Sequence, residues 1–338
     1  MEKLLTVIVP TYNMEALLKR CLNSVCINDT ALEIVVIIDG ATDRSSEIAH
    51  EYQDKYPQIF RVIEKENGNY GSCINRGLAE AKGKYIKVLD ADDLFNTEAL
   101  TALLFFLKDS DADLVITNYC ICNAYGEIIE RKKFNLPTKT LFTAKDLTPL
   151  GPHMAMHAVT YKTENLRHIC YQQSEGISYT DQEWIYKPMT TVKSFVYADL
   201  DLYKYVTGRE GQTMDIKALR RNMHHNLMVL GNMIETYNES QSDADIYGYL
   251  RTRIECYTEY IYSLYLFNIK QMNTEPLALF DKNLRTLCPQ LYKYTANLKA
   301  GKLPFIRLWR ILGYPNNDYG IINFFRYRRY NPLALLSK

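Results

Sequence analysis

The first part of the chain alternates between short apolar runs and amphipathic stretches, with polar turns between them. The runs are nearly continuous in apolar residues, as is typical of parallel strands that are covered on both faces. The stretches carry apolar residues at three- and four-residue spacing, which predicts helices packed on a sheet. The predicted strands are 4–9, 33–38, 61–64, 84–89 and 113–117, and the predicted helices are 14–25, 46–56, 73–81 and one beginning near Thr97. This alternation predicts an α/β fold with a doubly wound, mainly parallel sheet.

The pattern changes at residue 216, where long helical patterns replace the strand-and-turn alternation. Apolar residues at helical spacing predict helices over 216–237, 246–267 and 276–298. We therefore predict two parts, an α/β domain over residues 1–215 and a helical region over residues 216–338.

Three aspartates follow the strand that ends at Leu89, namely Asp90, Asp92 and Asp93. Residues two apart on extended chain point the same way, so Asp90 and Asp92 can address one ligand. Ligands gather at the carboxyl ends of strands in open α/β sheets. Two convergent carboxylates suit Mg²⁺ or Mn²⁺, which also hold substrate phosphates. The alternative is an acidic turn in which Asp92 or Asp93 merely caps the helix near Thr97.

Composition narrows the classes of function. The formal net charge is +1, which gives no overall electrostatic case for nucleic-acid binding. The 8 cysteines contain no C-x-x-C pair, which favours reduced thiols in the cytoplasm. The first residues show no secretory h-region, and no apolar run approaches the ~20 residues that span a bilayer. We expect a soluble, cytoplasmic protein.

The turn after the first strand holds Pro10–Asn13 and lacks the G-x-G-x-x-G pattern of dinucleotide-binding proteins. Gly68 and Gly71 follow a different strand, and their spacing does not fit a P-loop. A phosphate group would therefore be held by a metal or by side chains, which again indicates Asp92.

Four motifs in order resemble the family 2 glycosyltransferases of GT-A fold. They are T-V-I-V-P-T-Y-N (6–13), E-I-V-V-I-I-D-G-A-T-D-R-S (33–45), N-R-G-L-A-E-A-K-G-K-Y (75–85) and D-A-D-D (90–93). The resemblance covers about the first 215 residues. It implies a Rossmann-like, mainly parallel sheet with helices on both faces, and an inverting enzyme. The enzyme would use a nucleotide-diphosphate sugar, commonly a UDP-sugar, with Mn²⁺ or Mg²⁺.

The resemblance also implies roles for individual residues. Asp39 would contact the base, usually uracil, and Asp92 would hold the metal on the diphosphate. The remaining implied donor-side residues are Pro10, Thr11 and Tyr12 around the nucleoside, with Asp90 and Ala91 near the ribose and donor sugar. Two positions depart from the family pattern, because Ile38 stands where an acid is usual and Ile74 where an arginine is usual. Both affect the expected base contacts and leave the metal site unchanged.

Sugar transfer also needs a base that takes the proton of the acceptor hydroxyl. Asp181 is the candidate, in a segment that resembles the Glu-Asp motif of the family but has Thr180 in place of the Glu, with Glu183 in reserve. The alternative for Asp181 is a helix N-terminal charge. His153 or His157 would touch a sugar or the acceptor, or else be an ordinary buried histidine. Arg209, in a segment that covers the donor in related enzymes, is a candidate phosphate contact.

Residues 302–338 mix arginines with aromatic residues, which suits the surface of an anionic membrane. A lipid-linked or glycan acceptor, as in surface polysaccharide synthesis, would fit peripheral contact with the inner membrane face. The same composition suits a helix docked on the domain or a homodimer contact. The alternative to an enzyme is a non-catalytic nucleotide-sugar binding protein or assembly subunit that retains the fold. The donor sugar, the acceptor and the linkage are not fixed by these patterns.

Overall fold

The computed structural model describes residues 3–208, 216–268, 272–299 and 304–316. The chain divides into two compact units, and each is described by itself. Unit 1 comprises Met1–Ala144 and Met154–Glu210, and unit 2 comprises Lys145–His153 and Gly211–Lys338. Because residues 209–215 lie outside the described part of the chain, the proposed boundary after residue 215 stays a prediction.

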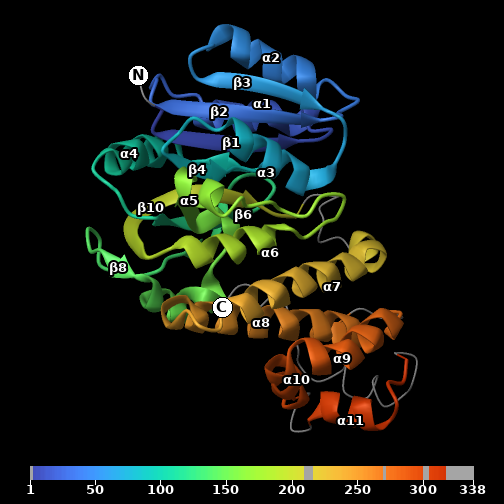
Figure 1. Cartoon of the computed structure of the whole chain (residues 1–338). Coiled ribbons are helices and arrows are strands. Elements are labelled where there is room, and N and C mark those ends of the chain that lie inside the picture. Colours follow the sequence, from blue (N-terminus) through green and yellow to red (C-terminus); the bar gives the residue numbers. More distant parts are fainter. Residues whose placement is uncertain (1–2, 209–215, 269–271, 300–303, 317–338) are drawn as a thin grey trace. The chain divides into compact units, whose positions relative to one another are not determined.

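Unit 1 is built on one sheet with the strand order β3-β2-β1-β4-β9-β6-β10-β5 (Figure 1). These strands are β1 (Leu5–Thr11), β2 (Leu32–Asp39), β3 (Phe60–Lys65), β4 (Tyr85–Val88), β5 (Leu94–Phe95), β6 (Leu114–Cys122), β9 (Val159–Lys162) and β10 (Ser194–Val206). Off this path, β7 (Ile128–Lys132) pairs with β6, and β8 (Phe142–Thr143) pairs with β10.

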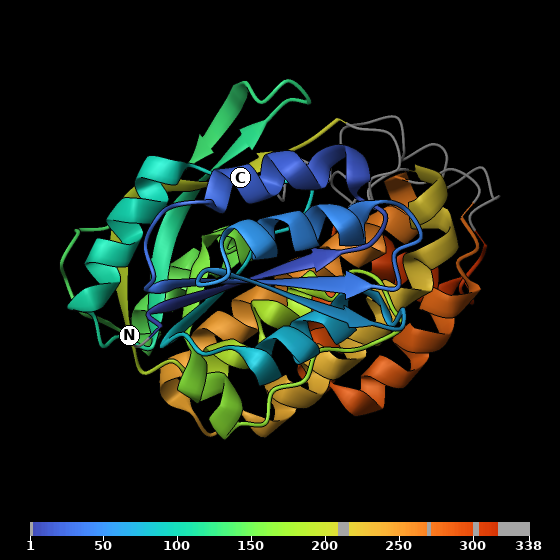
Figure 2. The ribbon, with the colours of Figure 1, turned by 90° about the horizontal axis from the view of Figure 1, so that it is seen from above.

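The first four strands along the chain are parallel to one another, and all residues of β2 are buried. Helices lie on both sides of these strands in the view from above (Figure 2). The helices of unit 1 are α1 (Glu15–Val25), α2 (Ser45–Lys55), α3 (Asn69–Glu80), α4 (Thr97–Lys108), α5 (Thr163–His168) and α6 (Asp181–Trp184). The predicted α/β fold with a mostly parallel sheet is therefore confirmed.

Parallel register brings the ends of neighbouring strands to one edge of the sheet. Thr11 at the end of β1 lies opposite Ile38, and Asp39 at the end of β2 lies opposite Lys65. β4 runs parallel to β1, so the acidic turn after Val88 reaches the same edge. The fold thus places the predicted donor-side segments along one edge.

Two later strands complete the sheet differently from the first four. β9 lies antiparallel between β4 and β6, and β10 runs parallel to β6 with register shifts between Ala198 and Tyr203. Beyond those shifts, β10 pairs with β5, which follows the acidic turn. β10 is not among the predicted strands, because the irregularity interrupts the regular alternation that marks a strand.

Unit 2 is helical, as expected. Its helices are α7 (Ile216–Glu239), α8 (Ala244–Ser263) with a π-helical turn (Leu264–Asn268), α9 (Glu275–Leu287), α10 (Pro289–Ala296) and α11 (Phe305–Ile311), and it includes most of the 3₁₀ segment Ala144–His153. The single helix expected over 276–298 is wrong. The chain breaks at Cys288, because a helix is disfavoured at the residue before a proline.

The described part of the basic, aromatic segment packs inside unit 2. Trp309 is buried, and Arg310 binds the buried Asp281 through two bonds, Nε to Oδ2 at 2.8 Å and Nη2 to Oδ1 at 2.6 Å. Helix α11 is therefore docked within unit 2, while residues 317–338 lie outside the described residues. Membrane contact and a homodimer contact stay predictions. Within the described chain, no helix has both the length and the hydropathy to cross a bilayer.

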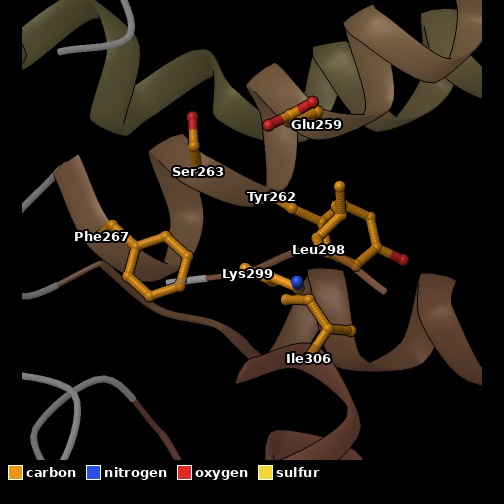
Figure 3. Close-up of a pocket in the computed structure, with 7 residues that line it drawn as sticks. All are labelled: Glu259, Tyr262, Ser263, Phe267, Leu298, Lys299 and Ile306. Atoms are coloured by element: carbon orange, nitrogen blue, oxygen red, sulfur yellow. The ribbon is translucent and has the colours of Figure 1, made fainter. Parts of the chain in front are cut away.

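A small, partly open hollow lies within unit 2 (Figure 3). Its lining is mostly apolar and aromatic, with Glu259 and Lys299 as the charged residues. Tyr262, another lining residue, already donates its hydroxyl to Asp281 at 2.5 Å. The hollow has none of the clustered carboxylates that distinguish the sheet edge of unit 1.

Gly71 in α3 offers a test of the packing beside that edge. A Cβ at this position would lie 1.9 Å from the Ser174 carbonyl oxygen. We expect Gly71→Ala to lower the free energy of unfolding by about 1–3 kcal/mol, as overpacked substitutions do. Gly231→Ala in α7 is the control, since nothing lies within 4 Å of its added Cβ and alanine favours helix. Thermal unfolding checks both, and an unchanged melting temperature for Gly71→Ala would contradict the close approach.

Candidate active site

The acidic turn leaves the end of β4 and is held by hydrogen bonds from distant parts of the chain. The Tyr70 hydroxyl donates to Asp90 Oδ1 at 2.9 Å, and the Asp90 backbone N–H donates to the Tyr203 hydroxyl at 3.1 Å. Arg20 Nη2 donates to the Asp92 carbonyl oxygen at 3.0 Å. The backbone of the turn is thus fixed at two points.

Helix α4, which follows the turn, is capped by Asn96. Its side chain accepts hydrogen bonds from the backbone N–H groups of Glu98 and Ala99, at 3.0 and 3.1 Å. Asn96 thereby satisfies N–H groups that the first helical turn leaves unpaired. The alternative in which Asp92 or Asp93 caps this helix is therefore wrong, and the aspartates need another explanation.

Asp93 joins the acidic turn to the end of β10. Its Oδ2 accepts a bond from the Tyr203 hydroxyl at 2.8 Å, and its Oδ1 accepts one from the Val206 backbone N–H at 2.7 Å. Burial, followed by the nearby charge of Asp90, raises the pKa of Asp93 well above its usual range. These two bonds hold Asp93 in place between the acidic turn and β10.

Asp181, the predicted base, begins α6 and lies near the acidic turn. Burial raises the pKa of Asp90 to about 6, and the charge of Asp181 adds to this rise, while the hydrogen bond from Tyr70 opposes it. Asp181 itself accepts a bond from the Gln182 side-chain amide at 2.7 Å. Asp181 therefore lies close enough to Asp90 for its charge to act on that carboxyl group, although the two residues are 91 positions apart in the chain.

Glu183, the reserve candidate, is engaged elsewhere. It is 6% exposed, and its carboxylate accepts bonds from the backbone N–H and the hydroxyl of Ser174, at 2.7 and 2.8 Å. These bonds tie α6 to the segment that packs on Gly71. The contacts of Glu183 with Ser174 therefore serve the packing of α6.

A group with the donor atoms of a metal site lies at the acidic turn. It comprises Asp90, Asp93 and His157, whose potential ligand atoms all lie within 4.8 Å of one another. Asp92, the predicted metal ligand, is not one of the three. The local sequence pattern does not indicate this group, since His157 meets carboxylates that lie more than sixty positions away in the chain.

His157 is held by aromatic rings and is kept neutral by its surroundings. Its ring lies 4.4 Å from that of Tyr203 and 4.7 Å from that of Tyr205, measured between centroids. Burial lowers the pKa of His157 to about 3, with a further contribution from the charge of Lys87. A neutral imidazole carries a nitrogen lone pair, so it can serve as a metal ligand.

Lys87 is a buried amine on β4, three positions before Asp90. Its Nζ donates to the carbonyl oxygens of His157 and Val159, at 2.8 and 3.0 Å, and burial lowers its pKa to about 7. Lys87 thereby fixes the segment that carries His157. The sequence did carry a signal, because a single lysine within an apolar strand of a parallel sheet is unusual.

The residues expected to bind the nucleoside lie at the ends of β1 and β2. Pro10 and Thr11 end β1, and Tyr12, which follows, is 49% exposed. Asp39 ends β2 and is nearly buried, and its Oδ1 accepts bonds from Lys65 Nζ at 2.7 Å and the Gly68 backbone N–H at 2.9 Å. The predicted residues therefore lie at one edge of the sheet. Their contact with a nucleotide base stays a prediction.

The other predicted residues are less informative. Ala91 is buried within the acidic turn. Arg209, the candidate phosphate contact, lies outside the described residues. The departures Ile38 and Ile74 are both buried apolar residues, at 3% and 0% exposure. His153 is exposed and belongs to unit 2. Of the two predicted histidines, His157 is therefore the one that is described beside the acidic turn.

Comparisons with known proteins indicate the family that this chain resembles. Residues 6–170 match the model of the glycosyl transferase family 2. The poly(ribitol-phosphate) beta-N-acetylglucosaminyltransferase TarS of Staphylococcus aureus is 28% identical over 212 residues, which cover 62% of this chain and 36% of that protein. The poly(ribitol-phosphate) beta-glucosyltransferase of Bacillus spizizenii is 29% identical over 221 residues, which cover 63% of this chain and 33% of that protein. The chain thus matches about a third of the length of these relatives.

A solved structure shows the same fold. The crystal structure of S. aureus TarS 1–349 in complex with UDP-GlcNAc superposes with a TM-score of 0.61 at 18% identity, covering 97% of this chain and 93% of that chain. The likeness covers the parallel sheet with its helices and the helical region after it. Residues 6–170 of this chain thus match the family 2 glycosyltransferases, and the chain shares the fold of TarS 1–349.

Proposed function

We propose that this chain transfers a sugar, with inversion at the anomeric carbon, from a UDP-sugar to a hydroxyl of a polyol-phosphate or related surface glycan. The observation that carries the proposal is the proximity of Asp181 to the acidic turn. The donor and acceptor classes are supported by the names of the relatives, which act on poly(ribitol-phosphate), and by the UDP-GlcNAc of the TarS structure.

Each residue would have a distinct task. Asp181 accepts the proton of the acceptor hydroxyl as that oxygen attacks the anomeric carbon, from the side opposite the leaving diphosphate. Asp39 and the three residues from Pro10 to Tyr12 hold the nucleoside. Asp90 and Ala91 lie along the ribose and donor sugar. Arg209 would contact the phosphates. Attack opposite the leaving group inverts the anomeric centre.

The residues at the acidic turn fit a divalent metal. Asp90, Asp93 and His157 already gather their donor atoms within 4.8 Å, and the His157 Nδ1 is buried without a hydrogen-bond partner among the described residues. Asp92 is the proposed ligand that faces the diphosphate. When bound, Mn²⁺ or Mg²⁺ would neutralise charge on the departing diphosphate.

A donor panel tests the function. The protein is heated with UDP-, GDP-, CMP- or dTDP-sugars, with and without Mn²⁺, because bound ligand raises stability in proportion to the logarithm of its concentration over Kd. We expect stabilisation by UDP-sugars that increases with Mn²⁺, reaching about 2.7 kcal/mol at a hundredfold excess over Kd. Transfer to a polyol-phosphate polymer is then measured with the donor that binds.

The outcomes separate the two functional classes. Binding of a UDP-sugar without transfer to any glycan acceptor would favour a non-catalytic binding or assembly protein. No stabilisation by any nucleotide sugar would contradict both. The cytoplasmic location, the membrane contact of residues 302–338 and a homodimer remain parts of the proposal that this panel does not address.

A further inference from the structure

We propose that His157 is a direct ligand, together with Asp90 and Asp93, of the divalent cation at the acidic turn, and that it makes this site select Mn²⁺ over Mg²⁺. The inference deepens the proposed function and rests on it only for the use of the metal in sugar transfer. The binding of the cation itself stands on the geometry of these three side chains.

The separation of the ligand atoms suits one shared ion. They lie within 4.8 Å of one another. An octahedral cation with bonds of about 2.1 Å holds neighbouring ligand atoms about 3 Å apart and opposite ones about 4.2 Å apart. Small rotations of the side chains would therefore bring all three atoms to bonding distance.

The two carboxylates retain the capacity to bind a cation. Asp93 accepts one hydrogen bond on each oxygen, from Tyr203 and Val206, and Asp90 Oδ1 accepts one from Tyr70. Each carboxylate oxygen has two lone pairs, so an additional ligand bond is available on both residues. Two carboxyl groups this close together in a buried site either keep a proton or have their charge compensated by a cation, and a bound cation would displace that proton.

His157 supplies an independent observation. Its Nδ1 is buried and, within the described part of the chain, has no hydrogen-bond partner. Buried polar atoms nearly always have a partner, and one without a partner calls for an explanation such as an ion. The rings of Tyr203 and Tyr205 and the bond from Lys87 to the His157 carbonyl hold the residue in place. The imidazole is thus preorganised next to the carboxylates.

The donor set leads to the metal preference. Two carboxylates alone would suit Mg²⁺ and Mn²⁺ alike, whereas an imidazole nitrogen suits transition metals better than Mg²⁺. Removal of the imidazole should therefore weaken Mn²⁺ binding more than Mg²⁺ binding. A merely structural histidine would not change this ratio.

The test measures binding of the metal alone to the full chain, with and without UDP. The free Mn²⁺ signal in electron paramagnetic resonance gives the Kd, and competition with Mg²⁺ gives the preference. We expect His157→Phe, which keeps an aromatic ring between the tyrosines, to raise the Kd for Mn²⁺ at least about tenfold. His157→Asn offers an amide oxygen and should retain Mg²⁺ binding while losing the preference for Mn²⁺. Exposed His168, changed to Gln, is the control and should bind both ions like the wild type.

The outcomes distinguish this inference from the proposed function. An unchanged Kd and an unchanged preference in folded His157→Phe or His157→Asn would overturn the role of His157, and sugar transfer could still be found. Absence of Mn²⁺ binding to the wild type, with or without UDP, would overturn it as well. Mn²⁺ binding that depends on His157, in a chain that transfers no sugar, would support this inference and contradict the proposed function.

Discussion

Asp181→Asn is expected to lower the rate of sugar transfer by about 10²–10⁴-fold, which is the usual contribution of a positioned general base. Asparagine has the same shape and can still accept the bond that the Gln182 amide gives to Asp181. It cannot take a proton from the acceptor hydroxyl. The Kd for the donor should therefore stay the same, and the loss should lie in kcat.

A matched control separates catalysis from helix stability. Glu98 is an exposed acid in the first turn of α4, as Asp181 is in the first turn of α6. Both acids interact favourably with their helix dipole, by about 0.3–1 kcal/mol. Glu98→Gln should lower the melting temperature slightly and leave transfer unchanged. If Asp181→Asn behaves the same way, Asp181 is only a helix N-terminal charge.

Asp92→Asn is expected to reduce transfer by about 100-fold or more and to remove the extra donor stabilisation that Mn²⁺ provides. The metal contributes several kcal/mol of charge stabilisation, and each 1.4 kcal/mol corresponds to about a factor of ten in rate. The fold should be retained, because Arg20 binds the Asp92 backbone carbonyl, which the substitution preserves. Transfer rates and donor melting curves with and without Mn²⁺ measure the effect.

Asp54 is an exposed acid of α2 and provides the control. Asp54→Asn should change neither the transfer rate nor the effect of Mn²⁺ on the donor melting curves. Wild-type transfer and a wild-type Mn²⁺ response in Asp92→Asn would contradict the role of Asp92. Mn²⁺ binding that survives Asp92→Asn but is lost in His157→Phe would assign the ion to Asp90, Asp93 and His157 without Asp92.

Local pattern was enough to predict the parallel half of the sheet. The apolar runs that became β1, β2 and β4 are nearly continuous, because parallel strands are buried on both faces. The acidic turn could also be placed at the carboxyl edge from its position after such a run. The long strand β10 escaped prediction, because its register shifts depend on partners that local pattern does not contain. The break before Pro289 was visible in the sequence and should have been predicted.

The sequence by itself determined the α/β fold, the family resemblance and the presence of three aspartates at a strand end, since these depend on periodicity and on neighbouring residues. Only the tertiary structure decided which of those side chains meet. It tied Asp93 to Val206 and Tyr203, placed Asp181 beside Asp90, and set the His157 ring against two tyrosines. The physical reason is that these contacts join residues from 46 to 113 positions apart, and only the strand order β4-β9-β6-β10 brings them together.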